Sequence, residues 1–190
     1  PRGYCEHLQH LLGAALAGPA DTHSPTSYLL VEKILASHER MPVEWPIAGT
    51  TGYEVAQVLN GLFVDPASET AMTRLYQRFT GRRQTFDDIV YDRKKLIIFH
   101  ALSSELTVLA NLLNEIAQAD PHTRDFTYHG LREALAEVVA RFPVYRTYVC
   151  NGQVSEEDRR YVRWAVTQAK KYSLGADTQV FDFIAALLLP

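Results

Sequence analysis

The chain has 190 residues, of which 47% are hydrophobic and 22% are charged. This composition is typical of a soluble globular protein, and the length allows one well-buried domain, so disorder is not the default expectation. A net charge of -3 gives no general attraction to nucleic acid or to anionic membrane surfaces. No stretch approaches the roughly 18 apolar residues of a membrane span.

Two cysteines, Cys5 and Cys150, are too few for a disulfide framework, which favours a reducing, cytoplasmic location. The apolar run at 11–20 imitates the core of a signal peptide. However, Glu6 and His7 precede it instead of a basic start, so we reject an export signal. The chain begins with Pro1 and ends on the apolar run FIAALLLP, from which we expect a piece of a longer polypeptide.

The first half of the chain predicts one short strand among helices. Apolar residues at helical spacing predict an amphipathic helix over 2–17, and a short strand is expected at 28–32. A helix over 53–62 follows. Asp65 and Pro66 then start another helix that runs to Gly81, because Asp accepts from free amides and Pro needs none.

The longest uninterrupted segment, 86–119, contains neither Gly nor Pro. It predicts one helix of about 33 residues, on the order of 50 Å long, with Thr85 and Asp88 forming a capping box at its start. The alternative is a helix that breaks near Ser103 and Ser104.

The last third is again mainly helical. Thr127 is expected to cap a helix over 128–141, and the alternating segment VYRTYVC at 144–150 predicts a second short strand. Ser155 with Asp158 is expected to cap a helix that ends near Ser173, and Thr178 to cap the last one. The predicted fold class is therefore mainly α, with one or two short strands.

Metal and nucleotide sites are not predicted. Cys5, His7 and His10 do not share one helix face, and neither HExxH nor CxxC occurs. The glycines at 49, 52 and 61 fit no phosphate-binding motif, and the GxSxG elbow of serine hydrolases is missing. We expect no metal and no cofactor.

Glu32 is the candidate catalytic residue, because it directly follows the apolar run YLLV. In a parallel barrel, polar residues at the C-terminal ends of strands point into the active-site mouth. Partial burial disfavours the charged form of a carboxyl, so such a group keeps a proton that it can donate to a leaving-group oxygen. Alternatively, Glu32 pairs with Lys33 or caps the next turn at the surface.

Residues near both predicted strands have the chemistry of a sugar site. Aromatic faces suit the C–H side of a sugar ring, and short hydroxyl groups or a guanidinium suit its hydroxyls. The candidates are Trp45, Thr50, Thr51, Tyr53, Arg146 and Tyr148, together with Lys33. Each aromatic could instead serve packing alone.

Four motifs carry a resemblance to a known family: VEKIL (31–35), AGTTGYE (48–54), NGLFVDP (60–66) and FPVYRTYV (142–149). They resemble the maltooligosyltrehalose synthases, also called (1→4)-α-D-glucan 1-α-D-glucosylmutases, of the α-amylase family of glycoside hydrolases. The likeness extends over the whole chain. It implies the middle fragment of a (β/α)8 barrel enzyme with a large helical insertion, where 1–48 and 142–190 belong to the barrel and 49–141 to the insertion.

The resemblance also implies a reaction. These enzymes isomerise the reducing-end α-1,4 link of a maltooligosaccharide to an α,α-1,1 link, and a partner trehalohydrolase releases trehalose from the product. Glu32 matches the general acid/base, and Lys33, Trp45, Thr50, Thr51, Tyr53, Arg146 and Tyr148 are expected substrate contacts. The nucleophilic Asp motif is not in this chain, so we expect the 190-residue piece to be inactive by itself. Alternatives are a non-catalytic helical glucan-binding or protein-interaction module, and another glycosidase of the α-amylase family.

Overall fold

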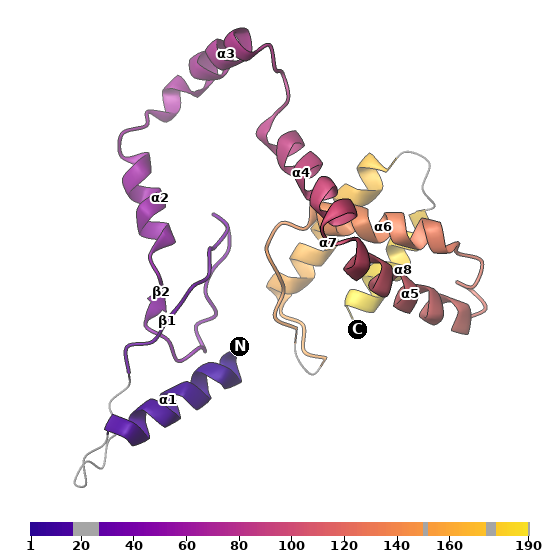
Figure 1. The fold of residues 1–190 in the computed structure, drawn as a ribbon, viewed down its shortest axis with the longest axis horizontal. Helices are drawn as coiled ribbons and strands as arrows, with labels where there is room; N and C mark the ends of the chain where they lie inside the picture. Colours follow the sequence, from indigo (N-terminus) through magenta and orange to yellow (C-terminus); the bar gives the residue numbers. More distant parts are fainter. Residues whose placement is uncertain (17–26, 150–151, 174–177, 190) are drawn as a thin grey trace. The chain divides into compact units, whose positions relative to one another are not determined.

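The computed structural model describes residues 1–16, 27–149, 152–173 and 178–189. Helices dominate these residues, which confirms the mainly α fold class (Figure 1). The chain divides into two compact units, an N-terminal unit of residues 1–80 and a C-terminal unit of residues 81–190. This division does not follow the expected boundaries of barrel and insertion, which stay a prediction.

The N-terminal unit contains a two-stranded parallel sheet, with one helix before it in the sequence and further helices after it. Its elements are α1 (Arg2–Leu16), β1 (Leu30–Val31), β2 (Gly49–Thr50), α2 (Tyr53–Gly61), η1 (Pro66–Ser68) and α3 (Glu69–Thr80). In the sheet, Leu30 pairs with Gly49 and Val31 pairs with Thr50. The strand expected at 28–32 is therefore present but shorter.

Gln9 of α1 fixes the chain segments that lead into both strands. Its amide nitrogen donates to the carbonyl oxygens of Ser27 and Pro46, each at 2.9 Å, and its carbonyl oxygen accepts from the Ser27 amide at 2.9 Å. One glutamine side chain thus bonds backbone groups of the two segments that precede β1 and β2, and it holds these segments side by side.

The apolar run that contains β1 is not buried in the described residues. Tyr28 is 82% exposed and Leu30 is 38% exposed. Parallel strands are normally covered on both faces and flanked by further strands. Within the part of the chain that the structure describes, β1 pairs with β2 alone, which leaves its apolar side chains open.

The C-terminal unit is a helical bundle built around α6. Its elements are α4 (Phe86–His100), α5 (Ser103–Ala119), α6 (Tyr128–Arg141), α7 (Glu156–Tyr172) and α8 (Thr178–Leu188). Helix α6 contacts each of the other four helices. The main core cluster includes Leu131, Ala134, Val138, Val162, Val166, Phe181 and Ile184.

The predicted continuous helix over 86–119 is wrong, and the break near Ser103 is correct. Helices α4 and α5 meet at 82°, and the amides of Ala101 and Leu102 both donate to the Ile97 carbonyl. The bend lets Ile98 of α4 and Leu106 of α5 join one buried cluster with Ala136 and Ala140 of α6. In a straight helix these two side chains would be about 12 Å apart along the axis.

The predicted second strand is also wrong, because residues 144–149 have no strand conformation. Val144 is buried, whereas Tyr145 is 92% exposed. A strand needs a neighbour to take its backbone hydrogen bonds. No β-ladder over 144–149 is found within the described ranges, and Cys150 lies outside them.

The predicted helix starts at Thr85, Thr127 and Ser155 are confirmed. Each side chain accepts a hydrogen bond from the amide three residues later, and Thr85 with Asp88 forms a full capping box. Asp65 accepts from the Ala67 amide at the start of η1, also as predicted. Local side-chain chemistry therefore fixes where four helical segments begin.

Among the residues described, no single helix has both the length and the apolar composition needed to cross a membrane. Helices α4 and α5 meet these conditions only when they are counted together across their bend.

Candidate functional site

The candidate site lies at the C-terminal ends of β1 and β2. Glu32 directly follows β1, and Thr51, Gly52 and Tyr53 directly follow β2. Because the strands are parallel and Val31 pairs with Thr50, Glu32 and Thr51 continue the same register. The Thr51 amide donates to the Val31 carbonyl at 3.1 Å, which extends the pairing up to the site. In parallel sheets, ligands bind at this edge.

Tyr53 contacts Glu32 directly. Its hydroxyl donates to Glu32 Oε1 at 3.2 Å. This hydrogen bond, and then the negative charge of Glu32 and burial, raise the pKa of Tyr53. Sequence reasoning proposed both residues for one site, and the structure brings them together.

The shelter that was expected around Glu32 is not seen in the described residues. Glu32 is exposed, and Tyr53 is 41% exposed. The described residues therefore bring an acid and a phenol together on an open surface.

The turn between β2 and α2 is fixed by Gly52 and Thr50. Gly52 precedes α2 with φ of 98°, a left-handed conformation that suits glycine. Thr50 Oγ1 accepts from the Gly52 amide at 3.2 Å and donates to Glu54 Oε2 at 2.6 Å. The bond from Thr50 lowers the pKa of Glu54. The Thr50 hydroxyl is therefore engaged within the turn, whereas Thr51 is exposed.

Lys33 and Trp45 are directed into the N-terminal unit. Lys33 Nζ donates to Glu39 Oε1 at 2.6 Å, and the two side chains are only 10% and 6% exposed. Trp45 is 9% exposed. Trp45 packs inside this unit and the Lys33 ammonium has a carboxylate partner, while the roles of both residues as glucan contacts stay a prediction.

Arg146 and Tyr148 lie in the C-terminal unit, in the segment that follows α6. The Arg146 guanidinium carbon lies 5.1 Å from the centre of the Tyr148 ring, and its Nε donates to the Thr147 carbonyl at 3.1 Å. Arg146 is exposed and Tyr148 is half-buried. The pair forms a cation–π contact that leaves part of the guanidinium open to solvent.

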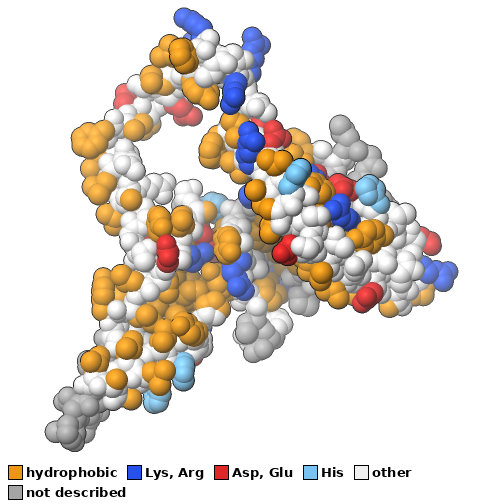
Figure 2. Space-filling view, viewed as in Figure 1, with side chains coloured by type: hydrophobic (Ala, Val, Ile, Leu, Met, Phe, Trp, Pro, Cys, Tyr) orange, Lys and Arg blue, Asp and Glu red, His pale blue; other side chains and the backbone are white. Residues whose placement is uncertain are grey.

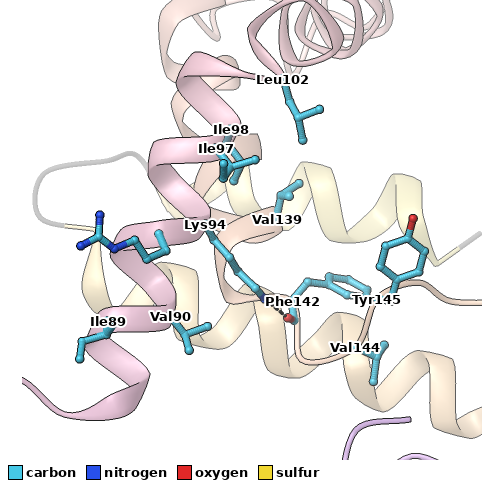
Figure 3. Close-up of a pocket in the computed structure, with 11 residues that line it drawn as sticks. Ile89, Val90, Lys94, Ile97, Ile98, Leu102, Val139, Phe142, Val144 and Tyr145 are labelled. Atoms are coloured by element: carbon cyan, nitrogen blue, oxygen red, sulfur yellow. Dashed lines mark hydrogen bonds between the residues drawn. The ribbon is translucent and has the colours of Figure 1, made fainter. Parts of the chain in front are cut away.

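A separate groove of about 670 Å³ lies in the C-terminal unit between α4, the end of α6 and the segment after it. Figure 3 shows Ile97 and Ile98 beside Val139, and the Lys94 side chain reaching Phe142. Lys94 Nζ donates to the Phe142 carbonyl at 2.8 Å, and burial lowers the pKa of Lys94. The groove is apolar and offers few partners for sugar hydroxyls, so we do not assign it to a glucan.

No group of three or more His, Cys, Asp or Glu side chains that could hold a metal ion occurs in the described part of the chain. Sequence reasoning missed Glu39 and Glu54, the partners of Lys33 and Thr50. Thr51 and Glu54 have the three-residue spacing of a capping box, which could have drawn attention to Glu54, although the structure joins Glu54 to Thr50. The contact of Glu39 depends on the path of an irregular loop, which the sequence does not reveal.

Comparison with solved structures relates the whole chain to one kind of enzyme. The chain aligns over its full length with the structure of maltooligosyltrehalose synthase from Arthrobacter ramosus, with a TM-score of 0.74 and 28% identity. The alignment covers 21% of that enzyme's chain. The chain resembles a segment of the maltooligosyltrehalose synthases. The DSM5389 glycosyltrehalose synthase shares the fold over 99% of the chain, with a TM-score of 0.64 and 24% identity.

Sequence comparison agrees with this resemblance. Over 120 residues, 63% of the chain, it is 33% identical to proteins of Mycobacterium tuberculosis strains CDC 1551 and H37Rv that are named as maltooligosyl trehalose synthases. The match covers 14% of these curated relatives' length. No protein-family model matches the chain.

Proposed function

We propose that this chain is part of a longer protein, here called the parent, that isomerises the reducing-end α-1,4 link of maltooligosaccharides to an α,α-1,1 link. The observation that carries the proposal is the position of Glu32. It lies beside Tyr53 at the C-terminal ends of two parallel strands, in a chain that resembles maltooligosyltrehalose synthases along its length.

In this proposal Glu32 is the general acid/base of a retaining intramolecular transfer. It protonates the glycosidic oxygen while a carboxylate nucleophile forms a glycosyl ester with the sugar. Glu32 then takes the proton from the anomeric hydroxyl of the released glucose, which attacks the ester. Such a mechanism needs two carboxyls about 5 Å apart.

The second carboxyl comes from the parent in this proposal, because the chain contains no R-x-D-H-x-D-G-like motif for the nucleophile. The 190-residue chain alone is then inactive. The parent supplies the remaining barrel strands and the walls that exclude water from Glu32. Thr51 and Tyr53 of the N-terminal unit are candidate glucan contacts, and so, separately, are Arg146 and Tyr148 of the C-terminal unit. We also propose a cytoplasmic location and a trehalohydrolase that acts on the product.

The test is to incubate the intact parent with maltopentaose and to follow reducing ends and free glucose. Isomerisation removes reducing ends without releasing glucose, whereas hydrolysis creates reducing ends. A loss of reducing ends supports the proposal if later treatment with a trehalohydrolase restores reducing ends and yields trehalose. A net gain of reducing ends contradicts it and favours another glycosidase of the same family.

A second candidate is a non-catalytic helical glucan-binding or protein-interaction module. The exposure of Glu32 in the described residues favours it. This candidate predicts that the parent binds maltopentaose in isothermal titration without changing it, so unchanged reducing ends over a long incubation would decide in its favour.

A further inference from the structure

Residues 31–35 alternate in exposure along an extended segment. Val31, Lys33 and Leu35 are half-buried, whereas Glu32 and Ile34 are exposed. Successive side chains of an extended chain point to opposite sides. The inward direction of Lys33 therefore fixes the outward direction of Glu32, its immediate neighbour.

Glu39 holds Lys33 in this inward position. Its Oε1 accepts from Lys33 Nζ at 2.6 Å, and its Oε2 accepts from the Ala36 amide at 3.2 Å. The Glu39 amide in turn donates to the Ala36 carbonyl at 2.9 Å. One carboxylate thus closes the loop that follows Glu32, at both a side chain and the backbone.

The ion pair is more enclosed than the others that are found among the described residues, since its two side chains are 10% and 6% exposed. Exposed ion pairs contribute little, because solvent screens them and their side chains lose entropy. An enclosed pair behaves differently. Removing one partner of an enclosed pair costs more stability than removing one partner of an exposed pair.

We propose that Lys33 and Glu39 are positioning residues that orient Glu32 for proton transfer, and that Lys33 is not a glucan contact. This inference rests on the proposed function. Without the contact between Lys33 and Glu39, the loop that follows Glu32 loses the carboxylate that closes it, and Glu32 shifts out of position. A displacement of about 1 Å in a catalytic group costs roughly a hundredfold in rate.

The experiment uses the intact parent with Lys33→Met, Glu39→Gln and the double substitution, compared at equal amounts of folded protein by near-ultraviolet circular dichroism. Glu44→Gln is the matched control, because Glu44 is exposed in the same connection. We expect each single substitution to lower kcat roughly tenfold to a hundredfold with KM for maltopentaose within about twofold. The double variant should lose less than the product of the two single losses, because both single substitutions break the same contact.

The pH profile of kcat of the same variants separates a positioning role from a loss of stability, which alone would leave the profile unchanged. A displaced Glu32 meets a different environment, so the pH profile of kcat should shift in both single variants and not in Glu44→Gln. An increase in KM for Lys33→Met with unchanged kcat would show that Lys33 contacts the glucan and would overturn the proposal. So would a kcat for Glu39→Gln equal to that of the control.

Failure of this inference differs from failure of the proposed function. If Glu32→Gln keeps full turnover, the proposed function fails and the orientation of Glu32 is irrelevant. If Glu32→Gln abolishes turnover while Glu39→Gln and Lys33→Met behave like Glu44→Gln, the proposed function stands and the positioning role alone is wrong.

Discussion

At the scale of single residues, Tyr91 and Glu137 form the main polar link between α4 and α6. The Tyr91 hydroxyl contacts Glu137 Oε1 at 2.8 Å and Oε2 at 2.9 Å, and Lys95 Nζ donates to Oε1 at 2.6 Å. The Arg141 guanidinium carbon lies 3.9 Å from the centre of the Tyr91 ring. Burial, followed by the hydrogen bond and the charge of Glu137, raises the pKa of Tyr91 to about 12.

This shift predicts a loss of stability at high pH. The folded pKa of Tyr91 is above the unfolded value of about 10, so the phenol's contribution is complete below pH 10 and is lost as pH rises toward 12. Tyr91→Phe should lower the free energy of unfolding by about 1 kcal/mol at pH 8. It should also flatten the pH dependence between 10 and 12, as measured by urea unfolding.

The control for this prediction is Tyr145→Phe, because Tyr145 is 92% exposed in the same unit. It should leave both the stability and its pH dependence unchanged. If Tyr91→Phe matches Tyr145→Phe, the bond between α4 and α6 contributes nothing to stability.

The sequence indicates where Glu32 lies but not how it is held. An acidic residue after an apolar run predicts the end of a strand, and the structure places it there, next to Tyr53. The pairing of Lys33 with Glu39 was not predicted, because it depends on the irregular path of residues 33–39. The family resemblance made Lys33 an expected glucan contact, whereas the structure gives its ammonium a carboxylate partner.

At the scale of secondary-structure elements, the start of α6 matters most because this helix contacts the four other helices of its unit. Thr127 Oγ1 accepts from the Gly130 amide at 3.1 Å. Thr127→Ala should reduce the free energy of unfolding by about 1 kcal/mol, since it leaves an amide of the first turn without its acceptor. Thr167→Ala, an exposed site inside α7, should change it by less than about 0.5 kcal/mol. Equal effects of the two substitutions in chemical unfolding would contradict the capping role.

Helix starts could be predicted from the sequence because capping depends on residues three positions apart. The break between α4 and α5 was predicted only as the alternative near Ser103 and Ser104, because the segment 86–119 contains no Gly or Pro that would require it. The bend follows instead from packing, which brings Ile98 and Leu106 onto α6. The segment 144–149 has the alternation of a strand but finds no strand partner in the described ranges. Tertiary contacts decided both outcomes.

At the scale of the whole molecule, burial is concentrated in the C-terminal unit. Helices α2 and α3 contain no buried residue, and Val58, Leu62, Met72 and Phe79 are all more than half exposed. Figure 2 shows apolar side chains spread over the surface of these two helices. Helices this short are marginal in water without tertiary packing.

We therefore predict very uneven hydrogen exchange in the 190-residue chain. Amides of α6 and α7 should be protected by the stability of the helical core, whereas amides of α2 and α3 should exchange close to the rate of an unstructured peptide. Mass spectrometry of peptides from each helix measures this difference. Similar protection in α2 and α6 would contradict it.

Hydrogen exchange of the intact parent distinguishes two descriptions of this chain: a segment of a larger enzyme, or a module that folds by itself. If the rest of the parent covers α2 and α3, their amides become protected there. Unchanged fast exchange in the parent would favour the helical interaction module.

The family resemblance could be predicted from the sequence, because four short motifs carry it and the comparisons agree. The environment of Glu32 could not be predicted. Its shelter depends on walls that the described residues do not supply, and in this chain the carboxyl is exposed.

The account depends on Glu32 as the proton donor and acceptor, so the most direct measurement is the turnover of maltopentaose by the intact parent carrying Glu32→Gln. Glutamine keeps the shape of the side chain but cannot exchange a proton. We predict that kcat falls roughly 10²- to 10⁴-fold, while KM and the melting temperature stay close to those of the unsubstituted parent. A Glu32→Gln parent that isomerises maltopentaose at nearly the normal rate would contradict the account.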